Sequence, residues 1–139
     1  MASLRCRSCL IDGEAVACDD GGVPDFKLLL RDRSYASAQL YAFDLLELDG
    51  EDRRSETIER RKRALTRLLG NDRAGVLISQ PIDAPADAAF RHICQLGFEG
   101  IVSKKLGSRY QPGRSSLWLK TLNPNAPALQ RLEQEDWRG

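Results

Sequence analysis

The sequence predicts a single α+β domain. Apolar residues follow the two-residue period of strands in some segments and the 3.6-residue period of helices in others. Strands of mixed type with helices laid between them favour this fold class. A chain of 139 residues, with 42% hydrophobic and 29% charged residues, has the size and composition of one globular domain.

The first half of the chain is predicted to hold two strands. Ser8–Ala17 is the first, and Asp12-Gly13 inside it marks a bulge or a close backbone approach. A turn rich in Asp and Gly follows, and then Pro24–Arg33 is expected to form a short helix. The second strand, Gln39–Leu48, ends at Asp49-Gly50, a pair that is typical of tight hairpin turns.

A longer helix is predicted next, with Ser55 as its N-terminal cap and Gly70 as its stop after Leu69. Acidic residues come early in this segment and basic residues late, as the helix dipole favours. Four aliphatic residues at helical spacing should form its buried face: Ile58, Leu65, Leu68 and Leu69.

A short strand and a second helix complete the middle of the chain. Gly75–Gln80 is the predicted strand, because it is apolar and is followed by a proline. Asp83–Leu96 is the predicted helix, with Gly97 as its C-terminal stop. Its inward residues are expected to be Phe90, Ile93 and Leu96.

The distribution of charge is more informative than its sum. The net charge is only +1, which by itself argues for no polyanionic partner. However, residues 103–131 contain no Asp or Glu, and their basic residues are Lys104, Lys105, Arg109, Arg114, Lys120 and Arg131. Such a segment can meet a phosphate backbone, and the alternative is a solvated basic loop.

Nothing in the sequence predicts a membrane segment, and a cytoplasmic location is the expectation. No apolar run approaches the ~18 residues of a membrane span, and the first residues lack the apolar core of a signal peptide. Cys6 and Cys9 form a C-x-x-C pair, but a zinc site would need a second pair or a nearby histidine. We therefore expect half-buried, reduced thiols, and His92 is expected to be a helix residue without a catalytic role.

Two short apolar segments near the C-terminus carry the most informative polar residues. Glu99-Gly-Ile-Val-Ser-Lys104 and Trp118-Leu-Lys120 place one carboxylate and two lysines on predicted strands. Ammonium groups bind phosphate oxygens as compact charges, and a carboxylate can hold a divalent metal. Strand alternation puts Glu99 and Lys104 on opposite faces, so a shared cleft requires a twist, a bulge or a strand-end position. The combination favours a nucleoside-phosphate site.

Four motifs, taken in order, resemble those of the adenylation domain of ATP-dependent DNA ligases, particularly the bacterial non-homologous end-joining type. They are Leu10-Ile-Asp-Gly-Glu14, Tyr41-Ala-Phe-Asp-Leu-Leu46, Glu99–Lys104, and residues 108–120, which end in Trp-Leu-Lys. The resemblance spans residues 10–127. It implies an ATP-grasp-like nucleotidyltransferase fold, in which antiparallel sheets hold the nucleotide between them.

The nucleophile of that family is the lysine of a Lys-x-Asp-Gly motif, which this sequence lacks. Its three Asp-Gly pairs have Leu10, Cys18 and Glu47 at the lysine position. We therefore expect residues 1–127 to form the C-terminal part of an adenylation domain, incomplete at its N-terminus and unable to adenylate itself. Residues 128–139 are expected to be a tail or the start of a linker to an absent OB-fold.

The resemblance implies a role for each candidate site residue. Glu14 would accept hydrogen bonds from the ribose hydroxyls, Phe43 would stack on adenine, and Glu99 would hold Mg²⁺ or Mn²⁺ near the α-phosphate. Lys104 and Lys120 are the expected catalytic phosphate contacts. The family has a second lysine two positions after Lys120, where this chain has Leu122.

The residues taken alone leave simpler interpretations open. Glu14 and Glu99 can equally be solvent-facing acidic residues on strands without a functional role. An aromatic residue such as Phe43 packs well in a core. Trp118 is assigned to the core. Asp44, beside Phe43, is expected to be a supporting residue without an assigned role.

The implied reaction has three steps and uses ATP. A lysine attacks ATP to form lysyl-AMP, the AMP passes to a DNA 5′-phosphate, and a 3′-hydroxyl displaces it to seal the nick. The expected partners are nicked or broken double-stranded DNA and an N-terminal ligase segment in trans. A non-catalytic remnant that binds nucleotide or DNA is the alternative. RNA-capping enzymes and RNA ligases use similar motifs, but the segment Gly-Arg-Ser-Ser-Leu-Trp-Leu-Lys favours a DNA ligase.

Overall fold

The larger sheet is built around β2 (Gln39–Leu48), whose bounds are those predicted from the sequence. The computed structural model describes residues 4–18, 20, 28, 38–70 and 75–126. In it, β2 pairs antiparallel with β1 (Cys9–Val16) and with the short β3 (Glu51–Asp52), and parallel with β4 (Val76–Ile78). β4 is therefore shorter than the predicted strand Gly75–Gln80.

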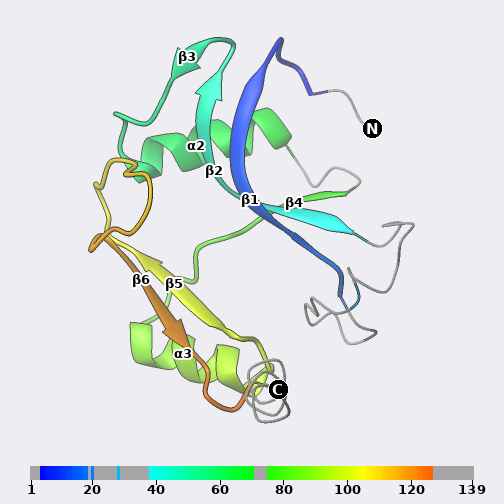
Figure 1. Ribbon diagram of the computed structural model, residues 1–139, viewed down its shortest axis with the longest axis vertical. Coiled ribbons are helices and arrows are strands. Elements are labelled where there is room, and N and C mark those ends of the chain that lie inside the picture. Colours follow the sequence, from blue (N-terminus) through cyan, green and yellow to red (C-terminus); the bar gives the residue numbers. More distant parts are fainter. Residues whose placement is uncertain (1–3, 19, 21–27, 29–37, 71–74, 127–139) are drawn as a thin grey trace, which may run out of the picture.

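Within the described residues, the helix that packs against this sheet is α2 (Ile58–Leu69) (Figure 1). The four aliphatic residues that the 3.6-residue period predicts on its inner face are all buried. The core cluster joins both elements and consists of Ala42, Leu45, Leu65, Leu68 and Leu69. Each large side chain buried here contributes about 1.5–3 kcal/mol relative to exposure, so this contact is the main support of the domain.

The helix α2 begins later than the sequence predicts. Ser55 is not its cap: the N-cap residue is Thr57, whose side chain makes no capping hydrogen bond. The backbone amide of Ile58 instead donates to the carbonyl of Ser108, at 2.9 Å. A distant loop thus satisfies a helix-terminal donor that a capping side chain would otherwise take. The helix α2 ends at Gly70, which has φ of 63°, as the sequence predicts.

The second helix, α3 (Ala86–Gln95), is also shorter than the predicted Asp83–Leu96. Pro85 takes the N-cap position, and a proline disfavours helical geometry at the residue before it. Leu96 is 46% exposed, so the prediction that it faces inward is wrong. Phe90 and Ile93 are half-buried, and only Ala89 is fully buried.

The pairing of β1 with β2 contains two irregularities, and the second is the one that the sequence predicts. The register shifts between Leu10 and Ile11, and again between Asp12 and Gly13. A side chain at Gly13 would lie 2.6 Å from the carbonyl oxygen of Tyr41, so Asp12-Gly13 marks both a bulge and a close approach. The hairpin from β2 to β3 turns at Asp49 and Gly50, which have φ of 53° and 88°.

A separate antiparallel pair, β5 (Gly100–Lys104) and β6 (Trp118–Leu122), forms the second sheet. Figure 1 shows it between α3 and the larger sheet. The loop that joins its two strands is held against the start of α2. The amide of Gly107 donates to Glu59 Oε1 at 2.7 Å, and the amide of Tyr110 donates to the carbonyl of Arg54 at 3.0 Å. These bonds fix the position of the smaller sheet relative to β2.

Two predicted segments lie outside the described residues: the helix Pro24–Arg33, of which only Leu28 is described and is helical, and the tail 128–139. The division at residue 127 therefore stays a prediction. None of the described helices is long and apolar enough to cross a membrane. The cysteines Cys6, Cys9, Cys18 and Cys94 are half-buried and form no disulfide, and His92 lies exposed on α3.

Candidate functional site

The register of β5 and β6 brings the two predicted phosphate contacts to one face. Val102 lies opposite Lys120, and Lys104 lies opposite Trp118. Cross-strand partners and residues two apart share a face, so Lys104 and Lys120 are on the same side of this sheet. The strands approach closely at Gly100, where a Cβ atom would collide with the carbonyl oxygen of Thr121. That position needs glycine.

Lys104 connects the two sheets. Its Nζ atom lies 3.9 Å from the ring centroid of Trp118 and 5.6 Å from that of Phe43 on β2. The aromatic faces attract the ammonium group. Burial nevertheless lowers the pKa of Lys104 below its ordinary value, while Asp44 and Asp12 act in the opposite direction. A phosphate group bound here would compensate the Lys104 ammonium group for the hydration that it loses on burial.

Phe43 lies in the site rather than in the core. The register passes from Asp12 opposite Asp44 to Gly13 opposite Ala42, so Phe43 is the extra residue of the bulge. Its ring is half-buried, is absent from the core cluster, and faces Lys104. The expectation that an aromatic residue here fills the core is therefore not met. An available ring face beside a lysine suits a nucleobase.

Trp118 was expected in the core, and this prediction is wrong. The residue is half-buried, and its ring receives Lys104 on one side while Tyr110 packs against it edge-on, with ring centroids 5.7 Å apart. The reason is the register: the face of β6 that carries Trp118 points toward the larger sheet, not toward α3. Trp118 therefore forms a wall of the site.

A buried ion pair lies behind Phe43 and was not predicted. Arg61 of α2 donates from Nε to Asp44 Oδ1 at 2.8 Å and from an Nη atom to Oδ2 at 2.9 Å, and both side chains are 0% exposed. The guanidinium also lies 6.0 Å from the ring centroid of Tyr110. Asp44 thus has a definite supporting role. The sequence does contain an indication that Arg61 is buried: it lies on the apolar face of the helix, three residues after Ile58 and four before Leu65.

Lys62, the residue after Arg61, was also missed. Its Nζ atom donates to the carbonyl of Ser79 at 2.6 Å. Burial lowers the pKa of Lys62, the charge of Lys104 lowers it further, and Asp44 raises it. Two lysines with lowered pKa values are therefore close enough to repel each other. A concentration of positive charge of this kind favours an anionic ligand.

The two predicted carboxylates are exposed. Glu14 is on β1, opposite Tyr41 of β2. Glu99 immediately precedes β5 and Lys104 ends it, so the two residues lie at opposite ends of this strand. The backbone carbonyl of Glu99 accepts from the amide of Asn123 at 2.7 Å, so the main chain is fixed at this point.

The carboxylates limit how a metal ion could be held. Among the described residues, no three Asp, Glu, His or Cys side chains come together as a metal site. Both oxygens of Asp44 are occupied by Arg61. Magnesium keeps several water or phosphate ligands, so a single carboxylate such as Glu99 fits it as the one protein ligand.

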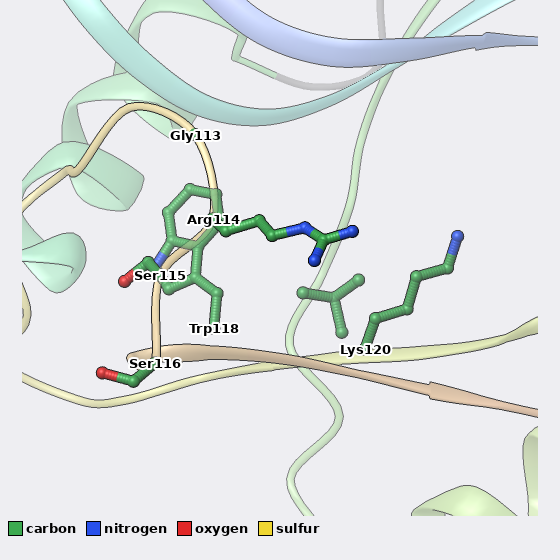
Figure 2. Close-up of a pocket in the computed structure, with 7 residues that line it drawn as sticks. Gly113, Arg114, Ser115, Ser116, Trp118 and Lys120 are labelled. Atoms are coloured by element: carbon green, nitrogen blue, oxygen red, sulfur yellow. The ribbon is translucent and has the colours of Figure 1, made fainter.

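An open pocket of about 540 Å³ lies on the same face of β5 and β6. Figure 2 shows the side chain of Arg114 reaching across from the loop and that of Lys120 rising from the strand beside it. No acidic residue lines it; the lining residues are Val102, Gly113, Arg114, Ser115, Ser116, Trp118 and Lys120. Aromatic, cationic and hydroxyl groups on one face, beside the lysine that contacts Phe43, can bind a phosphorylated aromatic ligand.

Residues 2–121 match the family model described as the ATP dependent DNA ligase domain. The chain therefore belongs to this family, and the resemblance noted in its motifs is confirmed. The match to a DNA ligase family also favours that assignment over an RNA-capping or RNA-ligase relative.

The relatives are of one particular kind. The multifunctional non-homologous end joining protein LigD of Mycolicibacterium smegmatis is 36% identical over 120 residues, which is 86% of this chain but only 16% of the relative. The ligase domain of M. tuberculosis LigD has a TM-score of 0.73 and 31% identity, covering 82% of this chain and 38% of that one. A mycobacterial DNA ligase D complexed with ATP and MES has a TM-score of 0.70 and 34% identity, covering 81% and 37%. The chain thus has the fold of the LigD ligase domain and spans about a sixth of the full-length relative.

Proposed function

We propose that this chain forms the nucleotide-binding part of a LigD-type ATP-dependent DNA ligase, which seals breaks in double-stranded DNA. The position of Lys104 carries the proposal. It contacts an aromatic ring on each sheet and shares its strand face with Lys120. One of the similar structures is a complex with ATP, which supports the choice of nucleotide.

In the proposed complex each part of ATP has a partner. Adenine stacks on Phe43, the ribose hydroxyls donate to Glu14, and the α-phosphate contacts Lys104. Lys120 lies further along the same face and contacts a neighbouring phosphate oxygen. The Asp44–Arg61 pair holds β2 and α2 in register behind the Phe43 ring, so the base-binding surface is preorganised.

The reaction forms a nitrogen–phosphorus bond and breaks the bond between the α-phosphorus and the departing pyrophosphate, and the attacking lysine loses a proton. Negative charge grows on the phosphate oxygens, where Lys104 and Lys120 stabilise it. A divalent cation beside Glu99 would supply further positive charge at the phosphates. The attacking lysine has to come from a segment with Lys-x-Asp-Gly, because none of the five lysines of this sequence lies in that motif.

The first experiment tests the missing nucleophile. The 139-residue chain is incubated with radiolabelled ATP and magnesium, and no covalent lysyl-AMP is expected. Lys62 and Lys104, whose pKa values are lowered, are the described lysines to inspect by peptide mapping. A stable label on either of them would contradict the proposal.

The second experiment tests the site. The chain is combined with an N-terminal segment bearing Lys-x-Asp-Gly and an OB-fold from a related ligase, and lysyl-AMP formation is measured. Glu99→Ala should lose at least ~100-fold, because one preorganised electrostatic group supplies about 3 kcal/mol. Leu122→Lys should raise the rate by adding a phosphate contact. Glu51→Ala, which removes an exposed acid on β3, is the matched control.

Two outcomes would redirect the proposal. If the assembled ligase is active and Glu99→Ala keeps the parental rate, the metal-binding role of Glu99 is wrong. If the assembly binds ATP but forms no lysyl-AMP, a non-catalytic nucleotide-binding remnant becomes the better description.

A further inference from the structure

We propose that Arg114 is a phosphate-binding residue and that, with Lys120, it holds the terminal phosphates of the nucleoside triphosphate. This inference rests on the proposed function, and it adds a residue to which the reaction scheme above assigns no role. Both side chains line one pocket, Arg114 from the loop and Lys120 from the strand beside it (Figure 2).

The pocket has an uncompensated positive charge. Its lining contains two cations and no carboxylate, and residues 103–126 contain no Asp or Glu at all. No ion pair of Arg114 or Lys120 is present within the described part of the chain. An anion is therefore the ligand that this charge distribution favours.

The loop that carries Arg114 is held in a fixed turn. Ser115 Oγ donates to Gln111 Oε1 at 3.1 Å and accepts from the amide of Leu117 at 3.1 Å. The amide of Trp118 donates to the carbonyl of Ser115 at 3.3 Å, and Gly113 has φ of 76°. The backbone of Arg114 is thus positioned before any ligand binds, which lowers the entropic cost of using its side chain.

The order of the groups identifies the ligand. Lys104 touches both Phe43 and Trp118, and Trp118 in turn lines the pocket with Arg114 and Lys120. From Phe43 outward, the site therefore offers an aromatic face, one lysine, and then an arginine with a second lysine. This is the order of a base, an α-phosphate and two further phosphates. A guanidinium can donate two parallel hydrogen bonds to phosphate oxygens, and an ammonium adds a point charge.

The test measures the affinity of the chain for ATP, AMP and inorganic pyrophosphate by calorimetry, with magnesium present throughout. Wild-type protein should bind ATP more tightly than AMP. Arg114→Gln should weaken ATP and pyrophosphate binding at least ~10-fold and leave AMP binding unchanged, because a charge-assisted bidentate contact is lost. Arg114→Lys should retain part of the affinity, since it keeps the charge without the fork.

Arg109→Gln is the matched control. It removes an exposed arginine of the same basic loop that does not line the pocket, and it should alter neither ATP nor pyrophosphate binding. Thermal melting of each variant confirms that the fold is intact, since both arginines are exposed.

The outcomes separate this inference from the proposed function. If ATP and AMP bind equally well to the wild type, or if Arg114→Gln leaves ATP affinity unchanged, Arg114 does not hold the terminal phosphates, although the nucleotide site stands. If Arg114→Gln weakens binding of nicked DNA but not of pyrophosphate, the phosphate belongs to the DNA strand and the inference is wrong. If the wild type binds pyrophosphate but neither ATP nor AMP, the adenosine site of the proposed function fails, while loss of pyrophosphate binding in Arg114→Gln would still support the phosphate-binding role.

Discussion

Arg61 and Asp44 are the pair of residues on which the back of the site depends. Both are fully buried, and their two hydrogen bonds satisfy the carboxylate. Arg61 also donates to the backbone carbonyl of Glu56, which ties the start of α2 to the same guanidinium. Removing one partner leaves a buried charge without compensation, which is far more costly than removing both.

Arg61→Ala or Asp44→Ala alone should therefore reduce the free energy of unfolding by about 3–5 kcal/mol, measured by urea denaturation. The double change Asp44→Leu with Arg61→Met should cost less than either single change, because no charge stays unpaired. Arg60→Ala, at an exposed neighbour, should fall within ~0.5 kcal/mol of wild type. Equal stability of Arg61→Ala and Arg60→Ala would disprove the structural role of the pair.

The lowered pKa of Lys104 leads to two effects of opposite sign. Phosphate binding needs the charged lysine, so ATP affinity should begin to fall as the pH approaches the lowered pKa, before the ordinary value of 10.5 is reached. Without nucleotide, the unfolded chain binds the extra proton between these two pKa values, so this residue makes stability rise with pH in that window.

The measurement is the ATP dissociation constant as a function of pH for wild type and Lys104→Arg. The arginine stays charged, so the affinity of this variant should decline less at alkaline pH. The ratio of the two curves isolates Lys104 from the titration of other groups. Parallel curves would show that Lys104 does not contact the phosphates.

At the scale of elements, the β5–β6 pair is the structure that places Lys104 and Lys120 on one face. It has only two strands, and such a pair is marginal without support. Helix α3 supports the pair through its contacts with β5. Hydrogen bonds from the loop that joins β5 and β6 to α2 and the residues before it support the pair at its other end. Gly100 lets the two strands approach each other at the start of β5.

Gly100→Ala should separate the strands at this point, because a methyl group would meet the Thr121 carbonyl oxygen. We expect faster hydrogen exchange throughout β5 and β6 and a loss of about 1–3 kcal/mol in stability. Ser103→Ala is the control: it changes an exposed residue of the same strand without adding an atom, so the strand amides should keep their protection. Unchanged exchange in Gly100→Ala would mean that the close approach is not needed.

The molecule as a whole presents apolar side chains along the smaller sheet and its loop. Leu106 is 79% exposed, Leu119 is 61% exposed and Val102 is 53% exposed. Within the described residues, β5 and β6 each pair on one side only. Unpaired strand edges and exposed apolar side chains both promote association.

The chain should therefore self-associate as its concentration rises, as measured by sedimentation velocity. Leu119→Lys should weaken association by placing a charge beside the strand edge. Ile82→Lys, which changes a similarly exposed residue in the connection before α3, should have little effect. A protein that stays monomeric at every concentration would refute this prediction.

The accuracy of prediction differed between elements for physical reasons. The bounds of β2 and the buried face of α2 were predicted correctly, because local periodicity reports burial directly. The start of α2 was predicted wrongly, since its first amide is satisfied by Ser108 from a distant part of the chain. The helix α3 begins later than predicted because Pro85 takes its N-cap position.

By itself, the sequence determined the α+β class and the ligase family, because ordered motifs and local periods can be read along the chain; the phosphate-binding roles of Lys104 and Lys120 stay predictions. Only the tertiary structure decided that Trp118 is a wall of the site, that Phe43 leaves the core through a bulge, and that Arg114 shares a pocket with Lys120. Those facts depend on strand register and on contacts between residues far apart in sequence, and no local pattern encodes them.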